Sequence, residues 1–282
     1  MAIKLISSDL NGTLVHQHTM SDLIRLYGQP ENFTRAKNLF DDRLAGKITV
    51  SKLLNGLAPL SKGITLRNAI EYVENDLEFI KGFDKYIEYL ENRNIPLVIN
   101  STGYSVTMYT IREIYGQRYF DHFICNKLEF GWNADQNRAV DDDELEELIE
   151  AYFRDKKHRK FGSYDDIRAT GRVRLTISEE SAKTGLLLKY LTVKYPGITL
   201  DQVVHIGDTM GDSHAIVDIA RAGGIGIAFN YNEPLEKHLI EVINTRPLLG
   251  TILMIDEKGG APDLNRVIKT LAKDPAPEES GP

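Results

Sequence analysis

The sequence has a single cysteine, Cys125, so the chain cannot form an internal disulfide. Disulfides are rare in reducing compartments, and Cys125 follows Phe123 and Ile124, in an apolar run typical of a buried strand. No segment approaches the roughly 20 apolar residues that a membrane helix needs. The N-terminal segment also turns polar too early for a signal peptide. We therefore expect a cytoplasmic protein with no membrane partner.

The sequence also lacks a long cluster of basic residues. Its 34 lysines and arginines are outnumbered by 41 aspartates and glutamates, which gives a net charge of -7. The longest basic stretch, 156–160, follows an acidic run and is typical of a solvated helix end. We therefore expect no nucleic-acid-binding surface.

Short apolar runs alternate with amphipathic stretches along much of the chain. The runs predict buried strands at Ile3–Ser7, Pro96–Asn100, Val173–Ile177, Val203–Ile206 and Ile225–Ala228. Helical periodicity predicts helices at Asp84–Arg93, Val106–Tyr115, Ser181–Tyr195 and Asp212–Ala222. This alternation favours an α/β fold with a parallel sheet.

Two segments interrupt the alternation. Residues from about 20 to 78 have a helical pattern and are long enough for a small helical subdomain inserted after the first strand. Residues from about 132 to 167 form a second insertion, whose apolar stripe could pack on the core or on a second copy of the chain. The last segment, 273–282, has the composition of a disordered tail.

Charged and polar residues follow the predicted strands at the edge where a parallel sheet binds its ligands. They lie in the segments Asp9–Leu14 and Asn100–Gly103, at Lys183 in the helix after the third predicted strand, and in Gly207–Asp212. Each segment alone could be an ordinary turn or helix cap. Their order, each after a predicted strand, favours one shared site.

The residue types at this site suit phosphoryl transfer. The Asp9 carboxylate can attack phosphorus and form an aspartyl-phosphate, provided that cations offset the repulsion between the two anions. The oxygens of Asp9 and Asp208 suit Mg²⁺, and Lys183 adds a positive charge. Ser101 or Thr102 can donate a hydrogen bond to a phosphoryl oxygen.

In this order and context, the motifs resemble those of the haloacid dehalogenase superfamily across nearly the whole ordered chain. Asp9, Ser101, Lys183 and the pair Asp208 and Asp212 match its four motifs. The resemblance implies a Rossmann-like core, an aspartyl-phosphate intermediate and a Mg²⁺ cofactor.

By this resemblance, Asp9 is the nucleophile and, with Asp208, a metal ligand. The carbonyl of Asn11 is a further ligand, and Asp212 lies in or next to the coordination shell. Ser101 matches the hydroxyl of the second motif, with Thr102 as the alternative. Further phosphate- or substrate-binding residues are expected at Gly12, Thr102, Gly103 and His18.

The segment before Ser101 resembles the helical cap of the phosphoserine-phosphatase-like branch. Residues 39–63 show the same order as that cap, a helix, a Gly-Lys turn and a helix that ends in Lys-Gly. The Asn-x-Leu segment at Asn126 also resembles a segment of that branch. The expected domains are a Rossmann-like core at 1–18 and 79–272, with the insertion at about 132–167, and a helical cap at 19–78. A homodimer is a further expectation.

Asn11 departs from the pattern of the family, in which most phosphatases have Asp at this position. That Asp protonates the leaving oxygen and then activates water, and such help is typically worth about 10²–10⁴ in rate. The protein could be a slow phosphatase that uses another base. It could catalyse phosphonate or phosphomutase-type chemistry, as the superfamily's phosphonoacetaldehyde hydrolases also lack this Asp. Asn11 could also be an engineered substitution that traps a substrate or intermediate. Alternatively, the protein could be a catalytically weakened relative that binds a phosphorylated ligand or a partner protein.

Histidines could replace the missing acid or base. His16 and His18 follow the first motif, although both also fit exposed loop positions, the interpretation we favour. His205 lies in an apolar strand and is typical of a core residue, and His214 lies on the following helix.

The expected substrate is a small phosphorylated metabolite other than phosphoserine. Phosphoserine phosphatases bind the amino group through a cap Glu and the carboxylate through a cap Arg. Ungapped comparison places these positions at His18 and Leu57, and neither residue matches. A substrate carboxylate near Leu57 would be left without a positive partner.

Overall fold

The computed structural model describes residues 3–116, 120, 122–133, 138–255 and 260–272. The chain divides into two compact units. Unit 1 contains Met1–His16, Glu78–Ser101 and Glu180–Pro282, and unit 2 contains Gln17–Leu77 and Thr102–Glu179.

Unit 1 is built on a parallel sheet with the strand order β2-β1-β6-β7-β8. Its strands are β1 (Leu5–Ser8), β2 (Leu97–Tyr104, whose last three residues belong to unit 2), β6 (Val203–Gly207), β7 (Ile225–Phe229) and β8 (Thr251–Ile255). All residues of β1, β6 and β7 are buried, because the central strands of such a sheet are covered on both faces.

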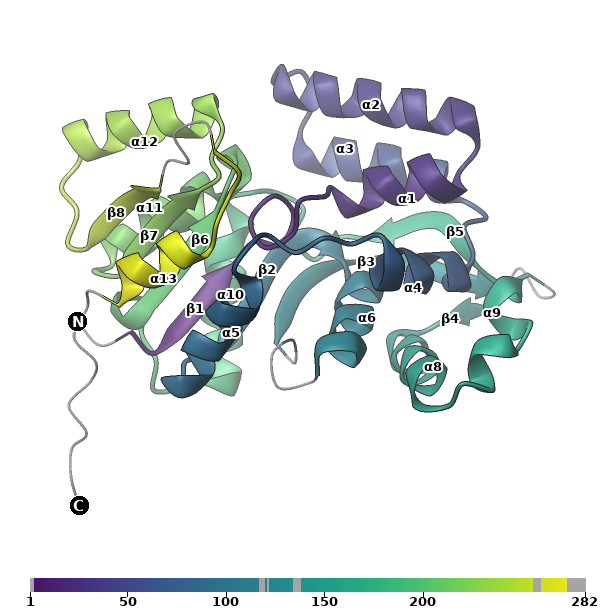
Figure 1. The fold of residues 1–282 in the computed structure, drawn as a ribbon. Coiled ribbons are helices and arrows are strands. Elements are labelled where there is room, and N and C mark those ends of the chain that lie inside the picture. The colour runs from purple at the N-terminus through teal and green to yellow at the C-terminus, as the bar shows by residue number, and fades with distance from the viewer. Residues whose placement is uncertain (1–2, 117–119, 121, 134–137, 256–259, 273–282) are drawn as a thin grey trace. The chain divides into compact units, whose positions relative to one another are not determined.

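The helices of unit 1 pack on this sheet and on one another. They are α5 (Phe83–Asn92), α10 (Ala182–Lys194), α11 (Ser213–Arg221), α12 (Glu233–Thr245) and α13 (Asn265–Leu271), with short 3₁₀ turns η3 (Leu200–Gln202) and η4 (Met210–Asp212). Helix α11 packs on β6 and β7, α10 lies beside α11, and α5 and α13 contact each other (Figure 1). Leu235 and Leu239 of α12 join Ile216 of α11 in one buried apolar cluster.

Unit 2 combines helices with an antiparallel sheet. Its elements are α1 (Thr19–Tyr27), α2 (Pro30–Leu44), α3 (Val50–Leu57), η1 (Ala58–Ser61), α4 (Leu66–Asn75), α6 (Ser105–Tyr115), β3 (Phe123–Trp132), β4 (Ala139–Val140), α8 (Asp142–Arg154), η2 (His158–Lys160), α9 (Ser163–Asp166) and β5 (Ile167–Arg174). Strand β3 pairs with β4 and β5, both antiparallel. The helix ends follow local signals, since Thr65 forms a capping box with Asn68 and Asp141 caps the acidic first turn of α8.

The mixed α/β fold with a parallel sheet is confirmed, whereas one strand prediction is wrong. The strand expected at Val173–Ile177 is instead β5, which begins at Ile167, ends at Arg174 and runs antiparallel to β3 in unit 2. The apolar residues Val173, Leu175 and Ile177 produced a local pattern that resembled a buried parallel strand. Lys183 therefore does not follow a strand of the parallel sheet. Strand β8 was not predicted from the sequence.

The helices α1 to α4 lie between β1 and β2 in the chain, where the helical insertion was expected. They belong to unit 2, which also holds residues 102–179 and therefore the segment expected as a second insertion. The domain bounds from the sequence stay a prediction, and the tail predicted at 273–282 lies outside the described residues. Within the described part of the chain, no helix combines the length and the apolar character needed to span a bilayer.

Candidate active site

A tight turn after β1 fixes Asp9. The Asp9 backbone N–H donates to the Ile206 carbonyl of β6 at 2.9 Å, which extends the pairing of the two strands by one residue. The carbonyl of Leu10 then accepts hydrogen bonds from Leu14 and Val15 at 2.8 and 3.0 Å. Leu10, Leu14 and Val15 are fully buried, so their side chains anchor the turn in the core. The Asp9 carboxylate is thereby held at the carboxyl end of the sheet.

Gly12 allows this turn to approach Asp208 closely. Its φ is +79°, which favours glycine, and a Cβ at this position would collide with the Asp208 carboxylate. The hydroxyl of Thr13 donates to Asp208 Oδ1 at 3.3 Å, and the Asn230 side chain donates to the Gly12 carbonyl at 2.7 Å. The turn after β1 and the loop after β6 are thus joined by direct contacts.

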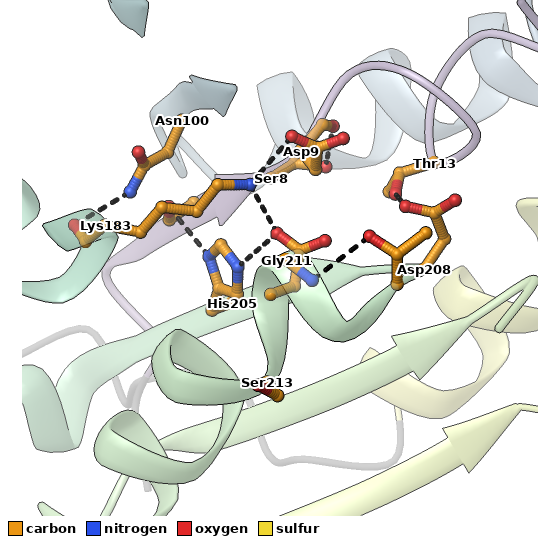
Figure 2. Close-up of polar contacts among 12 residues, drawn as sticks. Ser8, Asp9, Thr13, Asn100, Lys183, His205, Asp208, Gly211 and Ser213 are labelled. Carbon is orange, nitrogen blue, oxygen red and sulfur yellow. Dashed lines mark hydrogen bonds and ion pairs between the residues drawn. The ribbon is translucent and has the colours of Figure 1, made fainter. Parts of the chain in front are cut away.

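Lys183, on the first turn of α10, joins two carboxylates (Figure 2). Its Nζ donates to Asp9 Oδ1 at 2.9 Å and to Asp212 Oδ1 at 2.6 Å, while only 2% of its side chain is exposed. The Asn100 side chain donates to the Lys183 backbone carbonyl at 3.1 Å, which ties the start of α10 to β2. The loop before α10, not a parallel strand, delivers this ammonium to the site.

The charges at this site do not balance, because three buried carboxylates face one ammonium. Burial raises the pKa of Asp9, and Lys183 only partly offsets this. The pKa of Asp208 is raised well above its ordinary value by burial and by the charges of Asp9 and Asp212. Burial also acts to raise the pKa of Asp212, but Lys183 and His205 overcome it and bring the value down to about 2.

This imbalance fits a divalent cation. One carboxylate oxygen from each of Asp9, Asp208 and Asp212 lies within 4.8 Å of the others, and all three side chains are buried. Hard carboxylate oxygens suit Mg²⁺, and the excess negative charge is the feature that a bound cation would offset. The donor set therefore fits the expected magnesium site.

The structure brings most of the predicted site residues together in unit 1. Ser101 is fully buried in β2, as the last residue of this strand that belongs to unit 1, and it donates a hydrogen bond to Asp9. Asn11 is half-buried on the same turn as Asp9, and its backbone bridges to Val15. Thr102, Gly103 and His18 belong to unit 2, and their part in the site stays a prediction.

Other residues support the site although the sequence analysis gave them no such role. Thr13 and Asn230 hold the two loops, as described above. His205 was predicted to be a core residue; it is fully buried, and it also contacts Asp212 at 3.3 Å. A signal was present in the sequence, because His205 is a polar residue in an apolar strand just before the metal motif. His16, His18 and His214 are exposed.

Comparison with known proteins gives a consistent result. No protein-family model matches the chain. The chain is 25% identical over 229 residues to a phosphoserine phosphatase from Methanocaldococcus jannaschii, covering 80% of this chain and 85% of that protein. It is 25% identical over 126 residues to a 2-hydroxy-3-keto-5-methylthiopentenyl-1-phosphate phosphatase from Lysinibacillus sphaericus, covering 45% of this chain and 53% of the relative.

A solved structure shares the fold. It is a phosphoserine phosphatase with an analogue of its phospho-aspartyl intermediate, and it aligns with a TM-score of 0.63 at 20% identity over 96% of this chain and 99% of that one. At this identity, the match establishes the fold alone. In fold, in motif order and in its sequence relatives, the chain thus resembles the phosphoric monoester hydrolases of the haloacid dehalogenase superfamily, and within it the phosphoserine-phosphatase-like branch.

Proposed function

We propose that this protein is a cytoplasmic, Mg²⁺-dependent phosphatase that acts on a small phosphorylated metabolite other than phosphoserine, through an aspartyl-phosphate on Asp9. The observation that carries the proposal is the buried cluster in which Lys183 joins Asp9 to Asp212, with Asp208 beside them. A nucleophilic carboxylate, a fixed cation and an acidic ligand set are the groups that this chemistry requires.

In the first step, a carboxylate oxygen of Asp9 bonds to phosphorus while the bond from phosphorus to the ester oxygen breaks. Asp9 must be ionised to attack, and Lys183 favours that state against the effect of burial. Lys183 would also offset charge that develops on the phosphoryl oxygens, and the Ser101 hydroxyl would help to orient the phosphoryl group. Mg²⁺ held by Asp9, Asp208, Asp212 and the Asn11 carbonyl would add Lewis-acid polarisation of the phosphoryl group.

In the second step, water must attack phosphorus and release Asp9 and inorganic phosphate. Two proton transfers accompany the cycle, since the leaving oxygen gains a proton and the attacking water loses one. The Asn11 amide can donate a hydrogen bond but can perform neither transfer. We therefore expect slow turnover, supported by another base or by water.

The substrate proposal rests on unit 2. Leu57, the position that would need a positive charge to bind phosphoserine, is a buried leucine of α3, with 1% of its surface exposed. Val50 at the start of the same helix is also buried. A relative named for a methylthiopentenyl phosphate is consistent with a phosphate on a less charged body.

The first test is covalent labelling. Beryllofluoride forms a stable complex with a nucleophilic aspartate that mimics the aspartyl-phosphate. We expect one Mg²⁺-dependent complex per chain, detected by ¹⁹F NMR and absent from the Asp9→Asn variant. Failure to form this complex in the presence of Mg²⁺ would overturn the proposed nucleophile.

The second test separates a slow phosphatase from a binding protein. A metabolite-phosphate panel that includes phosphoserine and a methylthiopentenyl phosphate is assayed for turnover, and binding is followed by thermal shift. We expect Asn11→Asp to raise kcat by about 10²–10⁴, the usual contribution of general acid-base catalysis. Asn92→Asp is the control, because it adds the same charge at an exposed end of α5 and should leave the rate unchanged.

The outcomes of this panel distinguish the alternatives. Binding without turnover, with turnover restored in Asn11→Asp, supports a phosphate-ligand-binding protein whose active site has been weakened, naturally or by engineering. Good turnover with Asn11 in place rules that reading out. Turnover of a carbon–phosphorus substrate instead would favour phosphonate chemistry, and rapid hydrolysis of phosphoserine would overturn the substrate proposal.

A further inference from the structure

A buried histidine extends the site into the sheet. His205 lies in the middle of β6, with apolar Val204 and Ile206 on either side in the sequence, and it is fully buried. Its Nδ1 lies 3.0 Å from the Ser7 hydroxyl of β1, and its Nε2 lies 3.3 Å from Asp212 Oδ1. The His205 ring therefore bridges a serine of the core to a carboxylate of the site (Figure 2).

The two partners determine which ring nitrogen carries the proton. An ionised carboxylate can only accept hydrogen bonds, so Nε2 must be the N–H that donates to Asp212. In the neutral ring, Nδ1 is then an acceptor, and the Ser7 hydroxyl can donate to it. Ser7 is fully buried and faces this nitrogen from the neighbouring strand, so the position of the proton is set from both sides.

The histidine and Lys183 converge on one oxygen of Asp212. Lys183 Nζ donates to Asp212 Oδ1 at 2.6 Å, and His205 approaches that oxygen from the sheet. The Asp212 side chain also lies directly against Gly207, where a Cβ would collide with it. Two donors and a close backbone leave the carboxylate little freedom to rotate. Because Lys183 also donates to Asp9, the orientation of Asp212 helps to set where the ammonium lies.

We propose that His205, held by Ser7 as its Nε2–H tautomer, is a positioning residue that fixes Asp212 and through it directs Lys183 toward Asp9. The hydrogen bonds run from Ser7 through His205, Asp212 and Lys183 to the proposed nucleophile. The role of His205 in the rate rests on the proposed function, whereas its tautomer does not.

The tautomer is tested by NMR on the metal-free protein labelled with ¹⁵N at its seven histidines. The spectrum of His205→Gln, which lacks one histidine, assigns the His205 signals. We expect a protonated Nε2 and an unprotonated Nδ1, and Ser7→Ala should shift the Nδ1 resonance. An Nδ1–H tautomer, or a rapidly exchanging mixture in the native protein, would overturn the proposal.

The effect on rate is tested with a pair of variants assayed on p-nitrophenyl phosphate with Mg²⁺. His205→Gln keeps an N–H donor in reach of Asp212, whereas His205→Leu fills the space without one. Loss of hydrogen-bond partners that orient a ligating carboxylate typically costs about 10–100-fold in activity. We expect a loss of this size in kcat for His205→Leu and a loss under about 5-fold for His205→Gln, with similar melting temperatures for the two variants.

His214→Leu is the control, since His214 is exposed on α11 and should tolerate the change without effect on the rate. Equal losses in the leucine and glutamine variants, or no loss in either, would mean that His205 acts only by filling space and would overturn the proposal. If the native protein neither turns over p-nitrophenyl phosphate nor forms the beryllofluoride complex, the proposed function fails, and the NMR experiment still decides the tautomer.

Discussion

The charge cluster of the candidate site in unit 1 differs from several ion pairs of unit 2 in both burial and balance. In unit 1, Asp9, Asp208, Asp212 and Lys183 are all buried, with three carboxyl groups against one ammonium. In unit 2, several ion pairs are balanced and lie nearer to the solvent. Examples are Arg67 with Asp165, whose side chains are 19% and 50% exposed, and Arg159 with Glu74, at 35% and 27%.

This difference indicates which charges serve the fold and which serve chemistry. A balanced, partly exposed ion pair forms at little cost in free energy and contributes little to stability. An unbalanced buried cluster costs stability unless a ligand offsets it, so a fold retains it only where the charges have another use. The comparison therefore assigns the charged network of unit 2 to structure and the cluster around Asp9 to function.

The largest effect on stability is expected from loss of the one ammonium of the cluster. Lys183→Met keeps the length of the side chain but leaves Asp9 and Asp212 without their shared partner. Removing one partner from a buried ion pair typically costs about 3–5 kcal/mol. We expect a loss of this size in the free energy of unfolding of the metal-free protein, measured by urea denaturation.

Lys189→Met is the matched control, because Lys189 is an exposed lysine of the same helix. Its loss should change the free energy of unfolding by no more than about 0.5 kcal/mol. If both variants unfold at the same urea concentration, the charge imbalance of the cluster has been overestimated.

A smaller change in stability, and of the opposite sign, is expected when Asp208 is substituted. Its pKa is raised in the folded protein, so Asp208 lowers the stability of the fold at a pH above the pKa of an unfolded aspartate, and the full loss is reached above the raised pKa. Asp208→Asn should therefore be more stable than the native protein in metal-free buffer at neutral pH. Its advantage should shrink as the pH falls through the raised pKa toward about 3.9, the value of an unfolded aspartate. The change is isosteric, so the close contact with Gly12 is kept.

The measurement is the melting temperature of both proteins against pH, with and without Mg²⁺. We expect the variant to melt at least about 2 °C higher without metal, since about 1 kcal/mol corresponds to 2–4 °C in a chain of this size. Mg²⁺ at about 100 times its Kd should stabilise the native protein by about 2.7 kcal/mol, and the variant by less. A native protein that is the more stable of the two without metal would contradict the raised pKa.

The strands that position the site could be predicted from the sequence, whereas β5, β8 and the grouping of segments into two units could not. Strands β1, β6 and β7 were predicted within about two residues at each end, because a strand buried on both faces leaves an uninterrupted apolar run. The convergence of Asp9, Asp208 and Asp212 followed from their places after these strands. Lys183 was correctly assigned to the site, although the strand predicted before it was wrong. The assignment rested on the order of the motifs along the chain and not on that strand.

The missing parts depend on contacts between distant segments. Strand β5 places Arg168, Arg172 and Arg174 in a pattern without an apolar run, and its pairing with β3 defines it as a strand. The grouping of 17–77 with 102–179 is also a property of long-range packing, which local periodicity does not encode. His205 was identified as a core residue, but its link to Ser7 required the register of β1 and β6, and its link to Asp212 required the turn after β6.

The smallest effect is expected from the charge network of unit 2, which completes the comparison. Arg67 donates to Asp165 at 2.9 Å and also to the backbone carbonyl of Phe161 at 3.0 Å. In Asp165→Asn the guanidinium keeps its backbone partner, and the lost ion pair is half exposed on the aspartate side. Such pairs contribute about 0.2–1 kcal/mol. We expect a loss within that range by urea denaturation and an unchanged rate on p-nitrophenyl phosphate. A loss as large as that of Lys183→Met would show that balanced and unbalanced charges cannot be told apart by burial, and the division between structural and functional charge would fail.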